Sequence, residues 1–512
     1  LSCVNAPLGF LILLPTSSTV PPVFDTILPR YKKKMTLKTS SEKEKDEPTP
    51  YITNSKARLA EYMEDAPEML ELGKQRDSLT LGMKPEIGQE EPYEPWKKRD
   101  LTHPLGVMGA LFHMIKGSLG SGILAMPVAF KNGGLWTSLV GAIVVGIIYV
   151  HCVHILVYSS QVLCTRLKRP KLDFAEIAEG AFSTGPSKWR RYTAFAREFV
   201  DEALTLTYYL CCIVYVVFTA SSLKQVIDIN LNIDMDIRLY ILLVTVFVLP
   251  IGLIRNLKYL VPFSFVAIVA LTFGCGYVLF EVFHDLPPVS ARPAFNGFDS
   301  LPLFFSTIVY SMDGIGTVLP IENSMKNPQS FLGCPGVLNI SMIWLLILYC
   351  AMGFFGYLRY GDDTAGSITL NISSSIMGQV VKLAVSLNVL CSYGLFLYVP
   401  VEILWRKLEP NVGKSKKTLY YYSMRVILIL ASVVFAAIVP DLEPFLGLVG
   451  ALCSSTLVLF FPPIIELVTF WEDEDYMKRW RVVKNLLILL FWLLTLVTGV
   501  RTSLARIIDL YM

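Results

Sequence analysis

The chain has 512 residues, of which 53% are hydrophobic and only 17% are charged. Its mean hydropathy is +0.52 and its formal net charge is +3. These values exclude an ordinary soluble protein, and no basic stripe interleaved with aromatic residues supports nucleic-acid binding.

The N-terminal part differs in composition from the rest of the chain. Residues 1–34 are unlike the segment after them, and we interpret them as an upstream extension. Residues 36–100 are rich in Glu, Lys, Pro and Thr and lack long apolar periodicity, which is typical of disorder. We therefore predict a cytoplasmic, mostly disordered tail over 1–100 and a transmembrane domain over 101–512.

Eleven apolar runs come after the tail, most of them close to the ~20 residues that cross a bilayer. They predict an all-α membrane protein with spans one to five over about 105–283, six to ten over about 301–470, and an eleventh over about 483–506. The runs are 105–130, 135–163, 199–226, 238–254, 259–283, 301–322, 335–358, 376–402, 421–440, 445–470 and 483–506.

The distribution of lysine and arginine predicts the orientation. With the N-terminus in the cytoplasm, the inside loops hold twenty of these residues and the outside loops hold five. The C-terminus is then predicted to be extracellular or lumenal. Asn371 begins an Asn-Ile-Ser sequon in a predicted outside loop, so we expect glycosylation there.

The first span contains the stretch HMIKGSLGSGILAMP at 113–127, which is rich in residues that weaken helices. Such a stretch is compatible with close helix packing, or with a helix that unwinds in mid-membrane around a cavity or ligand. The unwound interpretation selects five candidate substrate-binding residues: Gly117, Ser118, Gly120, Ser121 and Gly122.

A matching interruption occurs in the sixth span, IVYSMDGIGTVLPIEN at 308–323, where a proline again follows the glycines. Recurrence of a break in the second half is expected of two inverted repeats, and close packing does not predict it. Here the candidate substrate-binding residues are Tyr310, Ser311, Asp313, Gly314 and Gly316.

Two facing breaks would suit a small zwitterion. The half-helix that begins near Ser121 presents free N–H groups and a positive dipole end to a carboxylate. The unpaired carbonyl groups of the second break can accept hydrogen bonds from an ammonium group. Glycine leaves no side chain between backbone and ligand.

Two ionisable residues are candidates for proton coupling. His113 lies one turn before the first break, and histidine titrates near physiological pH. Glu322 follows the second break, and the sequence leaves open a gating or coupling role and a solvated helix end. Lys116 has no role that the sequence identifies.

These stretches, with GYLRYGDD, GSITLNI, LYVPVEI and PPIIELVTF, resemble the proton-coupled amino acid transporters of the amino acid/auxin permease superfamily, insect members in particular. The resemblance covers roughly residues 100–500. It implies a LeuT-like fold with a 5+5 inverted repeat and broken first and sixth helices. It also implies proton symport of glycine, alanine or proline, with His113 as the coupling histidine. Many relatives have Glu at the position of Asp313.

We therefore predict a secondary active symporter of small neutral amino acids that works by alternating access. The alternatives are sodium coupling, or an amino-acid-sensing receptor whose tail engages a cytosolic signalling partner. An enzyme is not expected, because the loops supply no nucleophile, base and orienting group. The ten cysteines form no metal-ligand pattern, so we expect no cofactor and no metal. Plasma membrane and lysosomal or endosomal membranes both fit.

Overall fold

The computed structural model describes residues 93–99, 104–255, 261–312, 314–473, 476 and 478–509, with the backbone alone at 261–265. The chain divides into two units between Tyr93 and Glu94, and the second unit holds every helix that the structure describes. Most of the predicted tail is therefore outside the described residues. Asp313 is also outside them.

The described part of the chain is helical, which confirms the predicted all-α class. Its one β-type pairing is an isolated bridge between Leu105 and Met325. The α-helices are α4 (Val107–Ser118), α5 (Gly122–Gly133), α6 (Leu135–Arg166), α7 (Phe174–Thr184), α8 (Thr193–Leu231), α9 (Ile237–Gly252), α10 (Val261–His284), α11 (Leu301–Ser311), α12 (Ile315–Ser324), α13 (Val337–Tyr360), α14 (Ile376–Leu408), α15 (Lys417–Ile438), α16 (Leu442–Val449), α17 (Phe461–Phe470) and α18 (Arg479–Asp509).

Each predicted apolar run falls on a helical segment. Among the described residues, nine helical spans are long and apolar enough to cross a membrane, or ten when the bent pair α4 and α5 counts as one span. Helix α9 has 16 residues. At about 1.5 Å per residue it extends about 24 Å, less than the ~30 Å of a typical hydrocarbon core. Its status as the fourth span therefore remains a prediction.

The outer surface of the bundle is apolar, as a bilayer requires. On α18, for example, Leu487, Leu494 and Val497 are 61%, 54% and 57% exposed. Large apolar side chains are equally exposed on α9, α10 and α15. A contiguous surface of this kind marks a membrane or protein contact rather than a water-facing surface.

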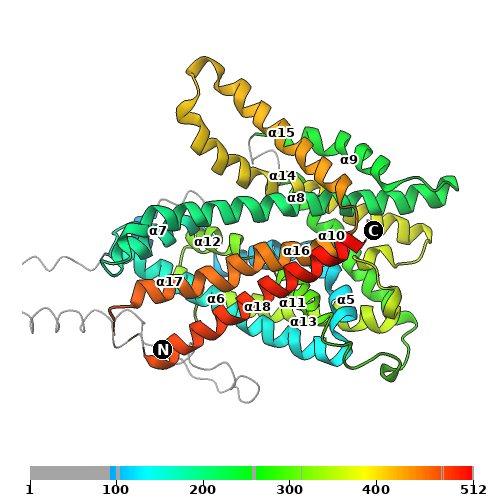
Figure 1. Ribbon diagram of the computed structural model, residues 1–512, viewed down its shortest axis with the longest axis horizontal. Coiled ribbons are helices and arrows are strands. Elements are labelled where there is room, and N and C mark those ends of the chain that lie inside the picture. Colours follow the sequence, from blue (N-terminus) through cyan, green and yellow to red (C-terminus); the bar gives the residue numbers. More distant parts are fainter. Residues whose placement is uncertain are drawn as a thin grey trace, which may run out of the picture. The chain divides into compact units, whose positions relative to one another are not determined.

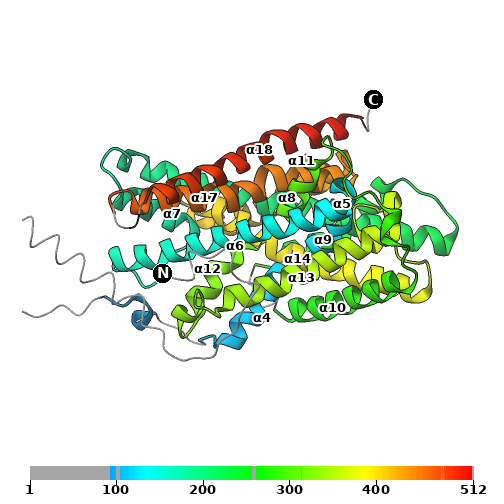
Figure 2. The ribbon, with the colours of Figure 1, turned by 90° about the horizontal axis from the view of Figure 1, so that it is seen from below.

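The helices run between two ends of the bundle. Figures 1 and 2 show α6, α17 and α18 lying alongside one another. The turn between α8 and α9 and the end of α18 lie at one end, whereas α7 lies at the other. Segments that we predicted to be outside and inside are thus separated along the bundle.

A short backbone link joins the first and sixth spans at the α7 end. Leu105 N–H donates to the Ser324 carbonyl at 2.9 Å, and Lys326 N–H donates to the Leu105 carbonyl at 3.0 Å. The segment that leads into α4 is therefore paired with the segment that leaves α12.

The tenth span, which we predicted over 445–470, is one helical segment from Leu442 to Phe470, but it is not α-helical throughout. Two π-helical turns, Gly450–Ser454 and Thr456–Phe460, separate α16 from α17. Gly450 lies against the backbone of Ser306 in α11, where a Cβ atom would collide with the Ser306 carbonyl oxygen. Such π-turns often occur at functional sites, and the first of these two lies against the first half of the sixth span.

Candidate functional site

The first span is interrupted between Ser118, where α4 ends, and Gly122, where α5 begins, and the two helices are bent by 54°. Leu119 N–H donates to the Ile115 carbonyl at 2.8 Å and closes the last turn of α4. The Ser121 side chain makes no capping hydrogen bond to α5. The positive end of the α5 dipole is therefore not neutralised by a side-chain cap.

The sixth span is interrupted between Ser311, where α11 ends, and Ile315, where α12 begins. Thr317 Oγ1 donates to the Gly314 carbonyl at 2.8 Å in the first turn of α12. The predicted site residue Asp313 falls in this interruption, outside the described residues. Breaks in the first and sixth spans were predicted, and both occur.

The two breaks pack directly against each other. A Cβ atom on Gly122 would lie 2.5 Å from Ser311 Cα and 2.6 Å from the Ser311 carbonyl oxygen. A Cβ atom on Gly314 would lie 2.5 Å from Ser118 Oγ. Gly122 faces backbone atoms and has no space for a side chain, whereas a side chain on Gly314 would displace the Ser118 hydroxyl. The structure thus brings the two predicted halves of the site together.

Side chains reinforce this contact. Ser121 Oγ lies 3.0 Å from Tyr310 Oη in a buried hydrogen bond. A Cβ atom on Gly117 would lie 2.7 Å from Thr317 Oγ1, so α4 and α12 are also close. Gly120 differs from its neighbours, because a Cβ atom there would meet nothing within 4 Å. The first break therefore has one open position among closely packed ones.

Two tyrosines from other helices complete the backbone hydrogen bonding of the breaks. Tyr149 Oη, from α6, accepts from Gly314 N–H at 3.1 Å. Tyr349 Oη, from α13, donates to the Ser118 carbonyl at 2.5 Å. Unwound backbone in a membrane needs such partners. The sequence analysis missed both residues, and their only signal is a tyrosine hydroxyl inside an apolar run.

A cavity of about 20 Å³ lies beside these groups, lined in part by Ser118, Tyr149, Met312 and Tyr349. Ser118 Oγ is buried there and has no hydrogen-bond partner among the described residues. A single water needs about 10–15 Å³, so this cavity fits one water and is too small for an amino acid. Apart from Ser118 and Met312, its lining comes from α6 and α13.

Another tyrosine reaches the second break from α8. A Cβ atom on Gly316 would collide with the Tyr208 hydroxyl oxygen, so glycine at this position lets the Tyr208 side chain approach α12. Tyr208 also contacts Phe396 of α14, with 5.1 Å between ring centroids. This aromatic pair, which the sequence analysis did not identify, connects the second break to helices α8 and α14.

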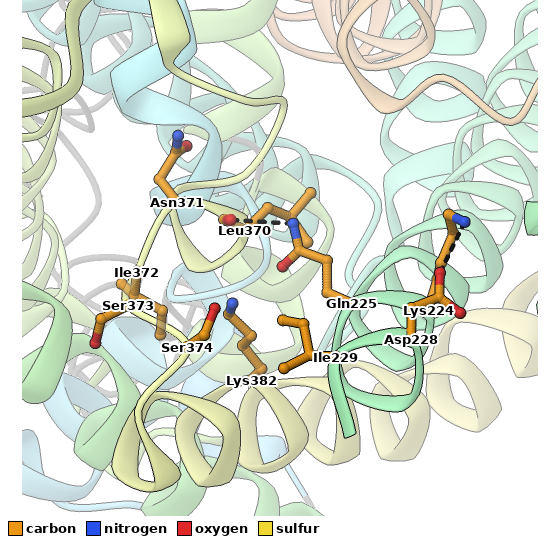
Figure 3. Close-up of a pocket in the computed structure, with 10 residues that line it drawn as sticks. All are labelled: Lys224, Gln225, Asp228, Ile229, Leu370, Asn371, Ile372, Ser373, Ser374 and Lys382. Carbon is orange, nitrogen blue, oxygen red and sulfur yellow. Dashed lines mark hydrogen bonds and ion pairs between the residues drawn. The ribbon is translucent and has the colours of Figure 1, made fainter. Parts of the chain in front are cut away.

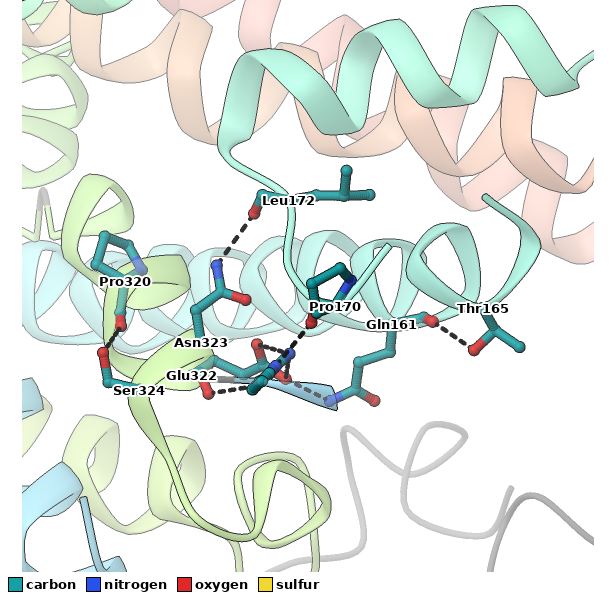
Figure 4. Close-up of polar contacts among 9 residues, drawn as sticks. Gln161, Thr165, Pro170, Leu172, Pro320, Glu322, Asn323 and Ser324 are labelled. Atoms are coloured by element: carbon teal, nitrogen blue, oxygen red, sulfur yellow. Dashed lines mark hydrogen bonds and ion pairs between the residues drawn. The ribbon is translucent and has the colours of Figure 1, made fainter. Parts of the chain in front are cut away.

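Glu322 does not lie at the break but at the other end of α12, in a buried ion pair (Figure 4). Arg99 Nη2 donates to Glu322 Oε2 at 3.1 Å, and the two side chains are 4% and 0% exposed. Gln161 Nε2, from α6, donates to Glu322 Oε1 at 3.1 Å. Arg99 also donates to the carbonyls of Pro170 and Glu322, both at 2.9 Å. Sequence reasoning missed Arg99 and Gln161.

His113 lies apart from both groups. Its side chain is on the exposed face of α4, next to Phe112, which is 66% exposed. Within the described residues it makes no hydrogen bond to Glu322 or to either break. Lys116, one turn later, is half-buried. The two predicted proton-coupling residues are therefore in different surroundings, one accessible and one buried.

The predicted glycosylation residue Asn371 is half-buried. Its amide nitrogen donates to the Asp363 carbonyl at 2.7 Å, and its amide oxygen accepts from Ala365 N–H at 2.8 Å. Attachment of a glycan to this nitrogen would alter the first of these contacts. Glycosylation at Asn371 stays a prediction.

Residues 103–505 match the model of a family described as transmembrane amino acid transporter protein. The chain is 40% identical over 420 residues to the proton-coupled amino acid transporter-like protein pathetic of Drosophila melanogaster, covering 82% of this chain and 89% of that one. It is 27% identical over 413 residues to the probable amino acid transporter skat-1 of Caenorhabditis elegans, covering 78% and 90%. Among solved structures, it is similar to Mhp1, a nucleobase-cation-symport-1 family transporter, with a TM-score of 0.47, 13% identity and coverage of 82% and 93%.

Proposed function

The chain belongs to the family of transmembrane amino acid transporter proteins, and from this premise we propose that it is a proton-coupled symporter of small neutral amino acids. Its relatives are transporters rather than enzymes, and it is a multi-pass membrane protein. Proton coupling is proposed because a 40% identical relative is called proton-coupled amino acid transporter-like. Transport would proceed by alternating access of one site to the two sides.

The observation that carries the proposal is the direct packing of the two breaks, Gly122 on Ser311 and Gly314 on Ser118. In the proposed site, the uncapped N-terminal end of α5 binds the substrate carboxylate. Carbonyl groups around the second break accept from the substrate ammonium. The residues proposed to bind substrate are Gly117, Ser118, Gly120, Ser121, Gly122, Tyr310, Ser311, Asp313, Gly314 and Gly316.

The crowding of the site supports the proposed preference for substrates with small side chains. Tyr149, Tyr208, Tyr310 and Tyr349 all reach the breaks, and the cavity beside them holds about 20 Å³. The breaks must separate to admit even glycine. Every added methylene of substrate demands a further displacement of close-packed tyrosines, which favours glycine, alanine and proline.

For the proton we propose His113 as the carrier and Glu322 as a second titrating group. The His113 side chain is exposed, whereas Glu322 is held by Arg99. An ionisable residue within a span is by default a functional candidate. We propose a cytoplasmic N-terminus, an extracellular or lumenal C-terminus, and a plasma, lysosomal or endosomal membrane.

The test is uptake of labelled glycine, alanine and proline by the purified chain in proteoliposomes, with an outside pH of about 5.5 or 7.5 around an interior near 7.5. Sodium is replaced by choline in a parallel series. We expect accumulation only with the inward proton gradient, in either salt. Accumulation that requires sodium would refute proton coupling. Absence of uptake for a wide amino-acid panel, with folded protein in the vesicles, would refute transport.

A further inference from the structure

A second cavity lies away from the breaks, between the end of α8, the segment before α14 and the start of α14 (Figure 3). Its volume is about 490 Å³, within the ~300–1,000 Å³ typical of small-molecule sites. No residue assigned to the breaks lines it. The polar lining includes Lys224, Gln225, Asp228, Ser374 and Lys382.

Lys382 is the unusual member of this lining, because a charged residue is rarely buried without a partner. It is only 2% exposed. Within the described residues its ammonium group makes no hydrogen bond, and no carboxylate oxygen lies within 4 Å of its nitrogen. Glu281 is the acidic group that acts on it electrostatically. Oε1 of Glu281 accepts from Ser373 N–H at 2.5 Å, and its Oε2 is buried without a hydrogen-bond partner among the described residues.

Gln225 supplies a complementary group. Its Nε2 donates to the Leu370 carbonyl at 3.1 Å, which ties α8 to the segment before α14. Its Oε1 is buried and has no hydrogen-bond partner among the described residues. In Figure 3 this amide and the Lys382 ammonium group point into the same space. One donor with a positive charge and one neutral acceptor are therefore both left unsatisfied in one cavity.

The other cation of the lining is already neutralised. Lys224 Nζ lies 2.8 Å from Asp228 Oδ2 and 2.6 Å from Asp234 Oδ1. The cavity therefore offers one positive charge without a direct ion-pair partner, that of Lys382, rather than a basic cluster. A single carboxylate matches that charge, whereas a phosphate headgroup carries several anionic oxygens and is best bound by more than one cation.

We propose that this cavity is a second amino-acid site, in which Lys382 binds the carboxylate and Gln225 Oε1 accepts from the ammonium group. The identity of the ligand rests on the proposed function, but the site itself does not. A bound amino acid would bridge α14, α8 and Ser374 of the intervening segment. It would thereby hold the segment before α14 against both helices. Binding would then favour a conformation in which this end of the bundle is closed.

The test is equilibrium binding of labelled alanine to the purified full-length chain in phosphatidylcholine nanodiscs. We expect two sites per chain in the wild type and one in Lys382→Met, with two retained in Lys382→Arg. Propionate, which has the carboxylate but no ammonium group, should compete at the second site and lose at least about tenfold in affinity in Lys382→Met. Ser374→Asp should abolish the second site without truncating Lys382, because it supplies a carboxylate within the cavity.

Several other outcomes of the binding experiment would overturn the proposed second site. A single alanine site in the wild type, or two sites in both Lys382→Met and Ser374→Asp, would overturn the proposal. So would loss of the second site when phosphatidylglycerol replaces part of the phosphatidylcholine, which would identify a lipid headgroup as the occupant. One binding site together with normal uptake refutes this inference alone. A Lys382-dependent site without any uptake refutes the proposed transport alone.

Discussion

The hydroxyl groups of Ser121 and Tyr310 lie 3.0 Å apart, so a buried hydrogen bond joins the first break to the last turn of α11. The N-terminal end of α5 and the second break are thereby fixed relative to each other. In the proposed alternating-access cycle, this hydrogen bond would be broken and re-formed each time the site opens and closes.

Tyr310→Phe removes this hydrogen bond and keeps the ring. Because such a bond contributes about 0.5–1.5 kcal/mol, we expect kcat/KM for alanine uptake to fall by roughly twofold to tenfold. Tyr357→Phe is the matched control, since the buried Tyr357 hydroxyl has no hydrogen-bond partner among the described residues. Equal uptake by Tyr310→Phe and the wild type would argue against a role of this pair in transport.

The glycines of the first break should respond differently to alanine. Gly122→Ala places a Cβ atom 2.5 Å from Ser311 Cα, and overpacking of this kind costs about 1–3 kcal/mol. We expect a lower unfolding temperature and strongly reduced uptake. Gly120→Ala should keep the wild-type unfolding temperature, because its Cβ atom meets nothing within 4 Å, but should raise KM.

The unfolding temperatures of both glycine variants are measured by heating the protein and monitoring the loss of the folded peak by size-exclusion chromatography. Gly276→Ala in α10 is the control for helix and membrane effects, because its added methyl group also meets nothing within 4 Å. An unfolding temperature of Gly122→Ala equal to that of Gly276→Ala would contradict the close approach of the two breaks.

The ion pair of Arg99 and Glu322 should be sensitive to removal of one partner. Arg99→Met leaves a fully buried carboxylate uncompensated, a change that costs about 3–5 kcal/mol. Adding Glu322→Gln to Arg99→Met should restore much of that stability. As a control, Lys97→Met breaks the exposed pair with Glu94 and should change stability by less than about 1 kcal/mol. A double variant less stable than Arg99→Met alone would refute the pairing.

His113→Ala should leave the unfolding temperature unchanged, because the side chain is exposed and makes no hydrogen bond within the described residues. It should abolish accumulation driven by a proton gradient while keeping exchange of labelled for unlabelled substrate. Phe112→Ala, on the same exposed face, is the control and should keep the pH dependence of uptake. If His113→Ala still accumulated substrate under a proton gradient, the proposal that His113 carries the proton would be refuted.

The sequence allowed good prediction of elements that depend on local pattern. Runs of apolar residues located the helical segments, and the glycines of 117–122 and 314–316 located both breaks. Tyr149, Tyr208 and Tyr349 could not be assigned to the breaks, because their partners are 100 or more positions away in the chain and only the packed bundle brings them together. Arg99 was missed because it lies at the edge of a segment whose composition resembles a tail.

The backbone link between Leu105 and residues Ser324 and Lys326 has a mechanical consequence. The half-helices α4 and α12 are joined by these two hydrogen bonds, so a movement of one about its break should also move the other. Main-chain bonds do not depend on side-chain identity, and this coupling should therefore survive most point substitutions at the three positions. A displacement of the chain just before residue 105 would therefore be transmitted to the breaks of both the first and the sixth span.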